Sequence, residues 1–163
     1  MSENKISKND VGISGEFYMA HILAKHGFKV NVSLGRTEGF DLFVKNPNGT
    51  SITVSVKTKY SSKAKDIIMN EKHETLIDES LFYAFVRLNM PDGVPEFWII
   101  PSNVVAEVIK TSYKIWKDTP GKGGKPHGDT NMRTLELKAS PLFPKDWEEQ
   151  LELFKGNIES LKE

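Results

Sequence analysis

The stretch Phe40–Tyr60, FDLFVKNPNGTSITVSVKTKY, decides how the first half of the chain folds, because it predicts two strands around a tight turn. The turn sequence Asn46-Pro47-Asn48-Gly49 suits a type I turn followed by a left-handed residue. Pro47 presets the first turn dihedral, and Gly49 accepts a positive φ without a Cβ clash. We therefore expect a hairpin with a three-residue loop and a glycine bulge.

The turn also fixes which side chains share a face of the hairpin. It sets Asn46 opposite Thr50. Further along the ladder Asp41 then lies opposite Ser55, and Lys57 falls on the same face because side chains alternate. The other face is apolar and is expected in the core: Phe40, Leu42, Val44, Ile52, Val54 and Val56. The polar face is either a functional site or the ordinary solvated side of an antiparallel sheet in an unrelated α+β protein.

Composition limits the class of protein. The chain has 163 residues, enough for a single domain over residues 1–163, in which we expect residues 1–10 to be a mobile lead. Its 22 basic and 22 acidic residues give a formal net charge of zero, which argues against a strongly basic nucleic-acid-coating protein but allows a local basic groove. The absence of cysteine excludes disulfides, thiolate metal sites and a cysteine nucleophile. No apolar run approaches membrane-spanning length, so we expect a cytoplasmic protein without membrane contact.

The order of the hydrophobic patterns predicts the fold class. Helical spacing of apolar residues predicts helices over residues 12–27, 70–77, 103–116 and 146–161. Alternation predicts strands over residues 28–34, 39–45, 50–58, 81–88, 96–100 and 132–138. Ser102 is the expected N-cap of the third helix, and a glycine-rich loop follows that helix. We expect an α/β (α+β) domain with a central mixed sheet of about five strands flanked by helices.

Three motifs follow one another in the first part of the chain: GEFYMAHILAKHGFKV at 15–30, GFD at 39–41 and VSVKT at 54–58. In this order they resemble the core of the PD-(D/E)XK nuclease superfamily, to which restriction endonucleases and archaeal Holliday-junction resolvases belong. LFYAFVRL at 81–88 and PEFWIIPSNV at 95–104 resemble small restriction-endonuclease-like proteins of the same superfamily. The resemblance implies a restriction-endonuclease-like domain that hydrolyses DNA as an endonuclease, with Mg²⁺ or Mn²⁺ as cofactor.

The resemblance also implies roles for single residues. Asp41 matches the metal-binding Asp, and Glu16 matches the helix glutamate that some members add as a further ligand. The backbone carbonyl of Val56 matches the oxygen that completes the metal shell, and Lys57 matches the Lys that orients the attacking water or stabilises developing charge. Ser55 stands where the motif has Glu or Asp. The site is therefore that of a weakened nuclease, or the domain is a catalytically inactive module for nucleic-acid binding or protein assembly.

A second region favours contact with nucleic acid. The loop TPGKGGKPHGDTNMR at 119–133 lets backbone amides approach phosphates. The expected contacts are Lys122, Lys125, His127 and Arg133 from this loop and Lys59 from the hairpin. A solvated surface loop is the alternative. DNA is the expected partner, RNA stays open as another substrate, and a homodimer would provide two sites to cut two strands.

Overall fold

The structure is a computed structural model that describes residues 6–33 and 40–163. In these ranges the α-helices are α1 (Lys8–Lys25), α2 (Ser102–Asp118) and α3 (Trp147–Phe154). The strands are β1 (Lys29–Val32), β2 (Leu42–Lys45), β3 (Ser51–Ser61), β4 (Asp66–Asn70), β5 (Leu81–Met90), β6 (Glu96–Pro101) and β7 (Met132–Glu136). The short 3-10 helices are η1 (Glu71–Glu74), η2 (Lys122–Gly124) and η3 (Glu159–Leu161). None of the helices in the described ranges is both long and apolar enough to cross a membrane.

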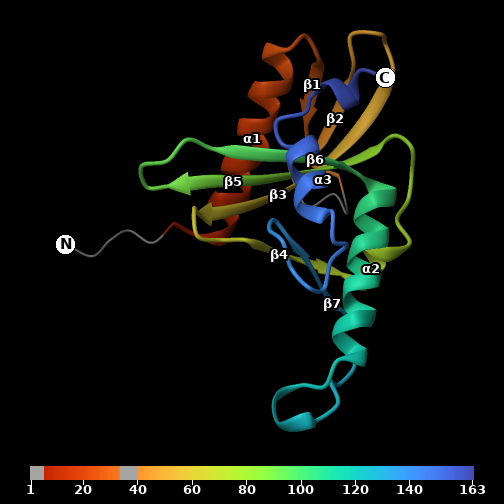
Figure 1. The fold of residues 1–163 in the computed structure, drawn as a ribbon. Helices are drawn as coiled ribbons and strands as arrows, with labels where there is room; N and C mark the ends of the chain where they lie inside the picture. Colours follow the sequence, from red (N-terminus) through yellow and green to blue (C-terminus); the bar gives the residue numbers. More distant parts are fainter. Residues whose placement is uncertain (1–5, 34–39) are drawn as a thin grey trace, which may run out of the picture.

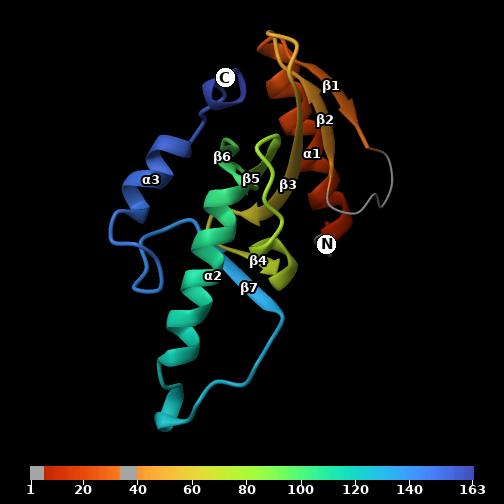
Figure 2. The same cartoon turned by 90° about the vertical axis from the view of Figure 1, so that its right-hand side faces the viewer.

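Five strands form one mixed sheet in the order β1-β2-β3-β5-β6. β3 and β5 are parallel, and the other neighbouring pairs are antiparallel. A separate two-stranded sheet of β4 and β7 lies against α2 (Figure 1). Figure 2 shows α1 on one side of the large sheet and α2 and α3 on the other. The prediction of an α+β fold with a mixed sheet of about five strands flanked by helices is confirmed.

The hairpin of β2 and β3 has the predicted turn and register. The N–H of Asn46 donates to the carbonyl of Thr50 at 2.9 Å, and Gly49 has a φ of +89°. Leu42 pairs with Val54, as the register requires. The predicted apolar face is buried except at its first residue, Phe40, which lies before β2, is only partly buried and packs with the core on the α2 side.

Each face of the large sheet has its own core. On one face, Met19 and Leu23 of α1 pack with Val54 and Val56 of β3. The other face carries the larger core, which β5, β6, α2, α3 and the small sheet share. The side chains of β3 that point to this second face are polar at two positions, Ser55 and Lys57, which lie beside Tyr83 and Phe85 of β5 in the parallel register. The fold thus brings the polar residues of β3 to the margin of a core.

The N-terminal part of the chain differs from the prediction. Ser7 caps α1 by accepting a hydrogen bond from the N–H of Asp10, so that the helix begins at Lys8. Residues 8–10 therefore belong to a helix and are not part of a mobile lead. Of the rest of the predicted lead, residues 6 and 7 directly precede the helix, and residues 1–5 lie outside the described residues, as do the strand residues predicted at 34 and 39.

The later helices also differ in their ends. The residue before α2 is Pro101, whereas the hydroxyl of Ser102 exchanges hydrogen bonds with the backbone of Asp78, at 2.8 and 3.0 Å. Ser102 is thus a tertiary contact and not an N-cap. The predicted helix over residues 146–161 stops early, because Gly156 adopts a φ of +63° and its N–H donates to the carbonyl of Phe97 on β6.

Between β3 and β5, the predicted short helix is present as η1, but the residues before it form a strand that the sequence pattern does not predict. This strand, β4, pairs with β7, which follows α2 in the chain. The side chains of Ile67 and Met69, on one face of β4, are buried in the larger core. The predicted strand at 132–138 is present as β7.

Candidate active site

Asp41 lies one residue before β2 begins, just beyond the last pair of the hairpin ladder, Leu42 and Val54. Its Oδ2 atom accepts a hydrogen bond of 2.6 Å from the N–H of Val56 and one of 3.3 Å from the hydroxyl of Ser55. The N–H of Asp41 donates to the carbonyl of Val54 at 3.3 Å. These contacts hold the carboxylate against β3, and both side-chain hydrogen bonds from the described residues end on Oδ2. Oδ1 is therefore available to another ligand.

Val56 brings a backbone carbonyl to the same edge of the sheet. The N–H and C=O groups of one strand residue point to the same side, and the N–H of Val56 points to Asp41. The ladder between β2 and β3 ends at Val54. The carbonyl of Val56 therefore faces a side of β3 that β2 no longer covers, next to the Asp41 carboxylate.

Glu16 approaches the same place from α1. Gly15 lets this helix lie directly on β3, since a Cβ at that position would come within 2.7 Å of Cγ2 of Thr58. Burial raises the pKa of the Glu16 carboxyl, the negative charge of Asp41 raises it further, and the positive charge of Lys57 lowers it. Two carboxylates and one amine are thus close enough for their charges to interact.

Lys57 is half-buried and follows Val56 along β3. Its charge acts on the pKa of two groups, Glu16 and His73, which come from opposite faces of the sheet. Lys57 forms no ion pair with any residue in the described ranges. Its amine is therefore available to a ligand at the edge where Asp41 lies.

Ser55 is 2% exposed and uses its hydroxyl as a donor to Asp41. Within residues 6–33 and 40–163, no group of three or more histidine, aspartate or glutamate side chains is arranged to hold a metal ion. The available donors are two carboxylates, those of Asp41 and Glu16, and the carbonyl of Val56. Mg²⁺ keeps several waters and is commonly held by one or two carboxylates, so a set of hard oxygens of this size suits it.

Two residues outside the three sequence motifs lie beside the site: His73, whose pKa the charge of Lys57 affects, and Tyr83, which is next to Ser55. His73 of η1 is buried, and its ring meets the ring of Tyr83 edge-on at 6.0 Å. Burial lowers the pKa of His73, a hydrogen bond with the backbone of Asn70 opposes this, and the charge of Lys57 lowers the pKa again. Tyr83 is the register neighbour of Ser55, and burial raises its pKa to about 12. No local motif signals these residues, because the parallel pairing of β3 with β5 brings them together.

The predicted nucleic-acid contacts are spread over the molecule. Lys122 and Lys125 are exposed in the loop after α2, which projects away from α1 and β3 in both views (Figures 1 and 2). His127 stacks on Trp116 with 4.0 Å between the ring centres. Lys59 is half-buried on β3 and lines a cleft beside the candidate site. The loop lysines and Lys59 therefore cannot act as one compact patch.

Arg133 does not belong with these contacts, which corrects the prediction. It is 7% exposed, its guanidinium pairs with Glu74, and it lies 3.5 Å from the centre of the Tyr113 ring. It also donates to the carbonyls of Thr130, at 2.7 Å, and Met132, at 3.0 Å. Arg133 thus ties β7 to η1 and α2 and is not free to contact a phosphate.

Comparison with known proteins gives a likeness of fold. No protein-family model and no curated relative matches the sequence. Among solved structures, the chain is similar to I-Ssp6803I, a bacterial homing endonuclease, with a TM-score of 0.55 and 14% sequence identity. The alignment covers 94% of this chain and 90% of that chain. At this identity the likeness establishes a fold that an endonuclease also uses.

Proposed function

We propose that this protein is a divalent-cation-dependent nuclease that hydrolyses phosphodiester bonds in DNA. The observation that supports the proposal is the setting of Asp41: it is hydrogen-bonded to Ser55 and to the N–H of Val56 beyond the end of the ladder between β2 and β3, and its charge and that of Lys57 both act on the pKa of the Glu16 carboxyl. The similarity of the whole fold to a homing endonuclease supports it. The preference for DNA over RNA follows the resemblance to the PD-(D/E)XK motifs, to which we assign the site.

The residues present fit Mg²⁺ or Mn²⁺. The raised pKa of Glu16 reflects, besides burial, a second carboxylate nearby, and a shared cation would relieve that repulsion. The carboxylates of Asp41 and Glu16 and the carbonyl of Val56 would hold the ion, since all are hard oxygen donors. When bound, such a cation polarises the phosphate and lowers the pKa of an attacking water.

Lys57 is the proposed charge-stabilising residue. Its ammonium group carries three N–H donors, and no carboxylate forms an ion pair with it in the described ranges. It can donate to a phosphate oxygen on which negative charge develops, or orient the attacking water. Asp41 keeps a fixed orientation throughout, because the N–H of Val56 holds its Oδ2 atom.

One observation favours a second function, that of a catalytically inactive nucleic-acid-binding module. Ser55 supplies a neutral hydroxyl at the position that carries a carboxylate in the motif, and this hydroxyl is hydrogen-bonded to Asp41. A site with one charge fewer holds a divalent cation less tightly. The fold and the exposed lysines would serve binding without cleavage.

A cleavage assay separates the two functions. Supercoiled plasmid and labelled single- and double-stranded DNA and RNA are incubated with Mg²⁺ or Mn²⁺ and the wild type, Asp41→Asn or Lys57→Ala. Asp118→Asn and Lys110→Ala, exposed positions on α2, are the matched controls. The nuclease proposal predicts cleavage that EDTA abolishes and that falls by about 100-fold or more in both site variants but in neither control. Binding of DNA without cleavage under all conditions would support the inactive module instead.

The plasmid assay also tests the proposed homodimer. Two sites that act together convert supercoiled plasmid directly into linear product. A monomer with one site produces nicked circles first. Early linear product, together with a dimer in light scattering, would support assembly into a homodimer, and nicked circles from a monomeric species would contradict it.

A further inference from the structure

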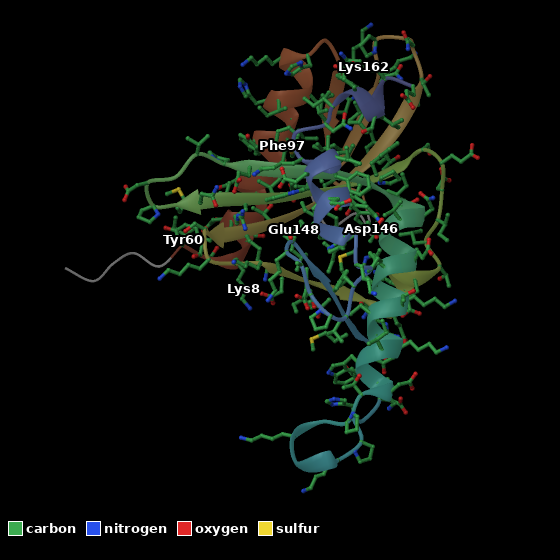
Figure 3. The ribbon with its side chains drawn as sticks, viewed as in Figure 1. Lys8, Tyr60, Phe97, Asp146, Glu148 and Lys162 are labelled. Carbon is green, nitrogen blue, oxygen red and sulfur yellow. The ribbon has the colours of Figure 1, made fainter. Side chains whose placement is uncertain are left out.

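A cleft of about 1160 Å³ opens beside Lys57. Its walls come from the beginning of α1, from β3 and from β4. Figure 3 shows Lys8 and Tyr60, which line the first two of these walls, at the same end of the sheet. Because Lys57 lines the cleft and also belongs to the candidate active site, a ligand in the cleft would lie next to that site.

Unpaired cations line this cleft. Lys8, Lys57 and Lys59 are among its lining residues, none of the described lining residues is acidic, and none of the three lysines forms an ion pair within the described ranges. Lys8 also occupies the first turn of α1, where a cation opposes the helix dipole. Three like charges around one cleft, without partners of their own, create a potential that attracts an anionic ligand.

Between the lysines the lining is aromatic and aliphatic. Ile6, Tyr60 and Ile68 line the cleft, with exposed fractions of 46%, 37% and 51%. Aromatic rings at a surface bind unstacked bases of any sequence, because every base offers a π-face. A duplex keeps its base faces stacked and presents phosphates and groove edges instead. Cations interleaved with apolar side chains therefore fit one unpaired strand better than a duplex.

The backbone of β3 adds a hydrogen-bond donor to the same cleft. The N–H of Val56 points to the side of β2, where it meets Asp41. N–H direction alternates along a strand, so the N–H of Thr58 points the same way, beyond the end of the ladder at Val54. The N–H of Thr58, on this uncovered edge and next to the lysines, offers a contact to a phosphate oxygen.

We propose that this cleft binds a single unpaired DNA strand that flanks the scissile phosphate, with a base against Tyr60 and phosphates against Lys8 and Lys59. The inference rests on the proposed function, since it takes Asp41 and Lys57 as the place of cleavage. It narrows the substrate class to DNA with an unpaired segment beside the cut, such as a strand end, a flap or a gap.

The test is a binding measurement without metal, in EDTA, so that no cleavage occurs. Fluorescence anisotropy compares a labelled single strand of thymidines with a duplex of equal length, over a range of salt concentrations. The variants are Tyr60→Ala, Lys8→Ala and Lys59→Ala, and circular dichroism verifies that each is folded. The controls are Tyr60→Phe, which keeps the ring, and Lys25→Ala, which removes a lysine from the opposite end of α1.

We expect the single strand to bind more tightly than the duplex. Tyr60→Ala should weaken single-strand binding by about 5- to 150-fold, the range for loss of one base stack, and leave duplex binding and the Tyr60→Phe protein unchanged. Lys8→Ala and Lys59→Ala should each reduce the slope of log K against log salt by about 0.7, while Lys25→Ala should not. The inference would be overturned if Lys8→Ala and Lys59→Ala had the same salt slope as Lys25→Ala, or if Tyr60→Ala lost the same affinity for the duplex as for the single strand.

Two further outcomes separate this inference from the proposed function. If Asp41→Asn cleaves DNA as well as the wild type, the proposed function fails, whatever the cleft binds. If cleavage requires Asp41 but neither Tyr60→Ala nor the lysine variants affect single-strand binding, the inference fails alone. A chain that binds neither probe but forms a dimer that Tyr60→Ala dissociates would assign the cleft to a second copy and would also overturn it.

Discussion

Gly15→Ala is a sharp test of how α1 positions the candidate site. The helix lies on β3 at this residue, and an added Cβ would stand 2.7 Å from Cγ2 and 2.8 Å from Cβ of Thr58, and closer still to its hydroxyl oxygen. Neither helix nor strand can accept such a contact without moving. The next residue along the helix is Glu16, so the displacement would reach the site directly.

The expected change in the free energy of unfolding of Gly15→Ala follows from two opposing effects. Alanine is favoured over glycine inside a helix by about 1 kcal/mol. Inserting a methyl group into a packed contact costs about 1–3 kcal/mol, and three close atoms place Gly15→Ala at the upper end of this range. We therefore expect the free energy of unfolding to fall by about 2 kcal/mol, and cleavage to fall because Glu16 is displaced.

Urea unfolding followed by circular dichroism measures the change, and the same helix provides the control. A Cβ at Gly12 would meet nothing within 4 Å, so Gly12→Ala should stabilise the protein by up to about 1 kcal/mol. Thr58→Ala in the Gly15→Ala background should recover part of the loss, since it removes two of the three crowded atoms. Equal or greater stability of Gly15→Ala compared with Gly12→Ala would refute the close packing of α1 on β3.

Three other changes have defined outcomes. Glu16→Gln should raise the free energy of unfolding of the metal-free protein at pH 7, because a raised pKa means that folding disfavours the ionised carboxyl. Unfolding measured at several pH values should show this gain in stability shrinking as the pH falls through the pKa of the folded state. The gain should vanish below the ordinary pKa of 4.5. Arg133→Ala should lower the free energy of unfolding by about 3–5 kcal/mol, because it leaves Glu74 unpaired, and should not change the salt slope of DNA binding. Ser55→Glu should lower the melting temperature without metal, since it adds a charge beside Asp41, and should enlarge the increase that Mn²⁺ produces.

The features that the sequence predicts well are those that local chemistry fixes. The turn at Pro47 and Gly49 determines the hairpin register, and the register alone puts Asp41 opposite Ser55 and on the face of Lys57. Alternation and helical spacing then give most of the other strands and helices. For the same reason the order of the three motifs is informative, because each is a short local stretch of the sequence.

The features that the sequence does not predict depend on contacts between distant segments. β4 pairs with a strand beyond α2, so its own five residues carry too little signal. Arg133 looks like a surface cation in a basic loop, and only the fold shows that Glu74 and the Tyr113 ring enclose it. The cleft beside Lys57 likewise requires the start of α1, β3 and β4 to meet in space.

Direct binding of a divalent cation is the closest test of the proposed metal site at Asp41. Isothermal titration calorimetry with Mn²⁺ would compare the wild type with Asp41→Asn, which keeps the shape of the side chain but removes its charge, and with the control Asp118→Asn. We expect one Mn²⁺ site in the wild type and in Asp118→Asn, and loss of that site in Asp41→Asn, because the ion is held mainly by charged oxygens. Equal Mn²⁺ affinity in the wild type and Asp41→Asn, or no binding by the wild type, would contradict this expectation.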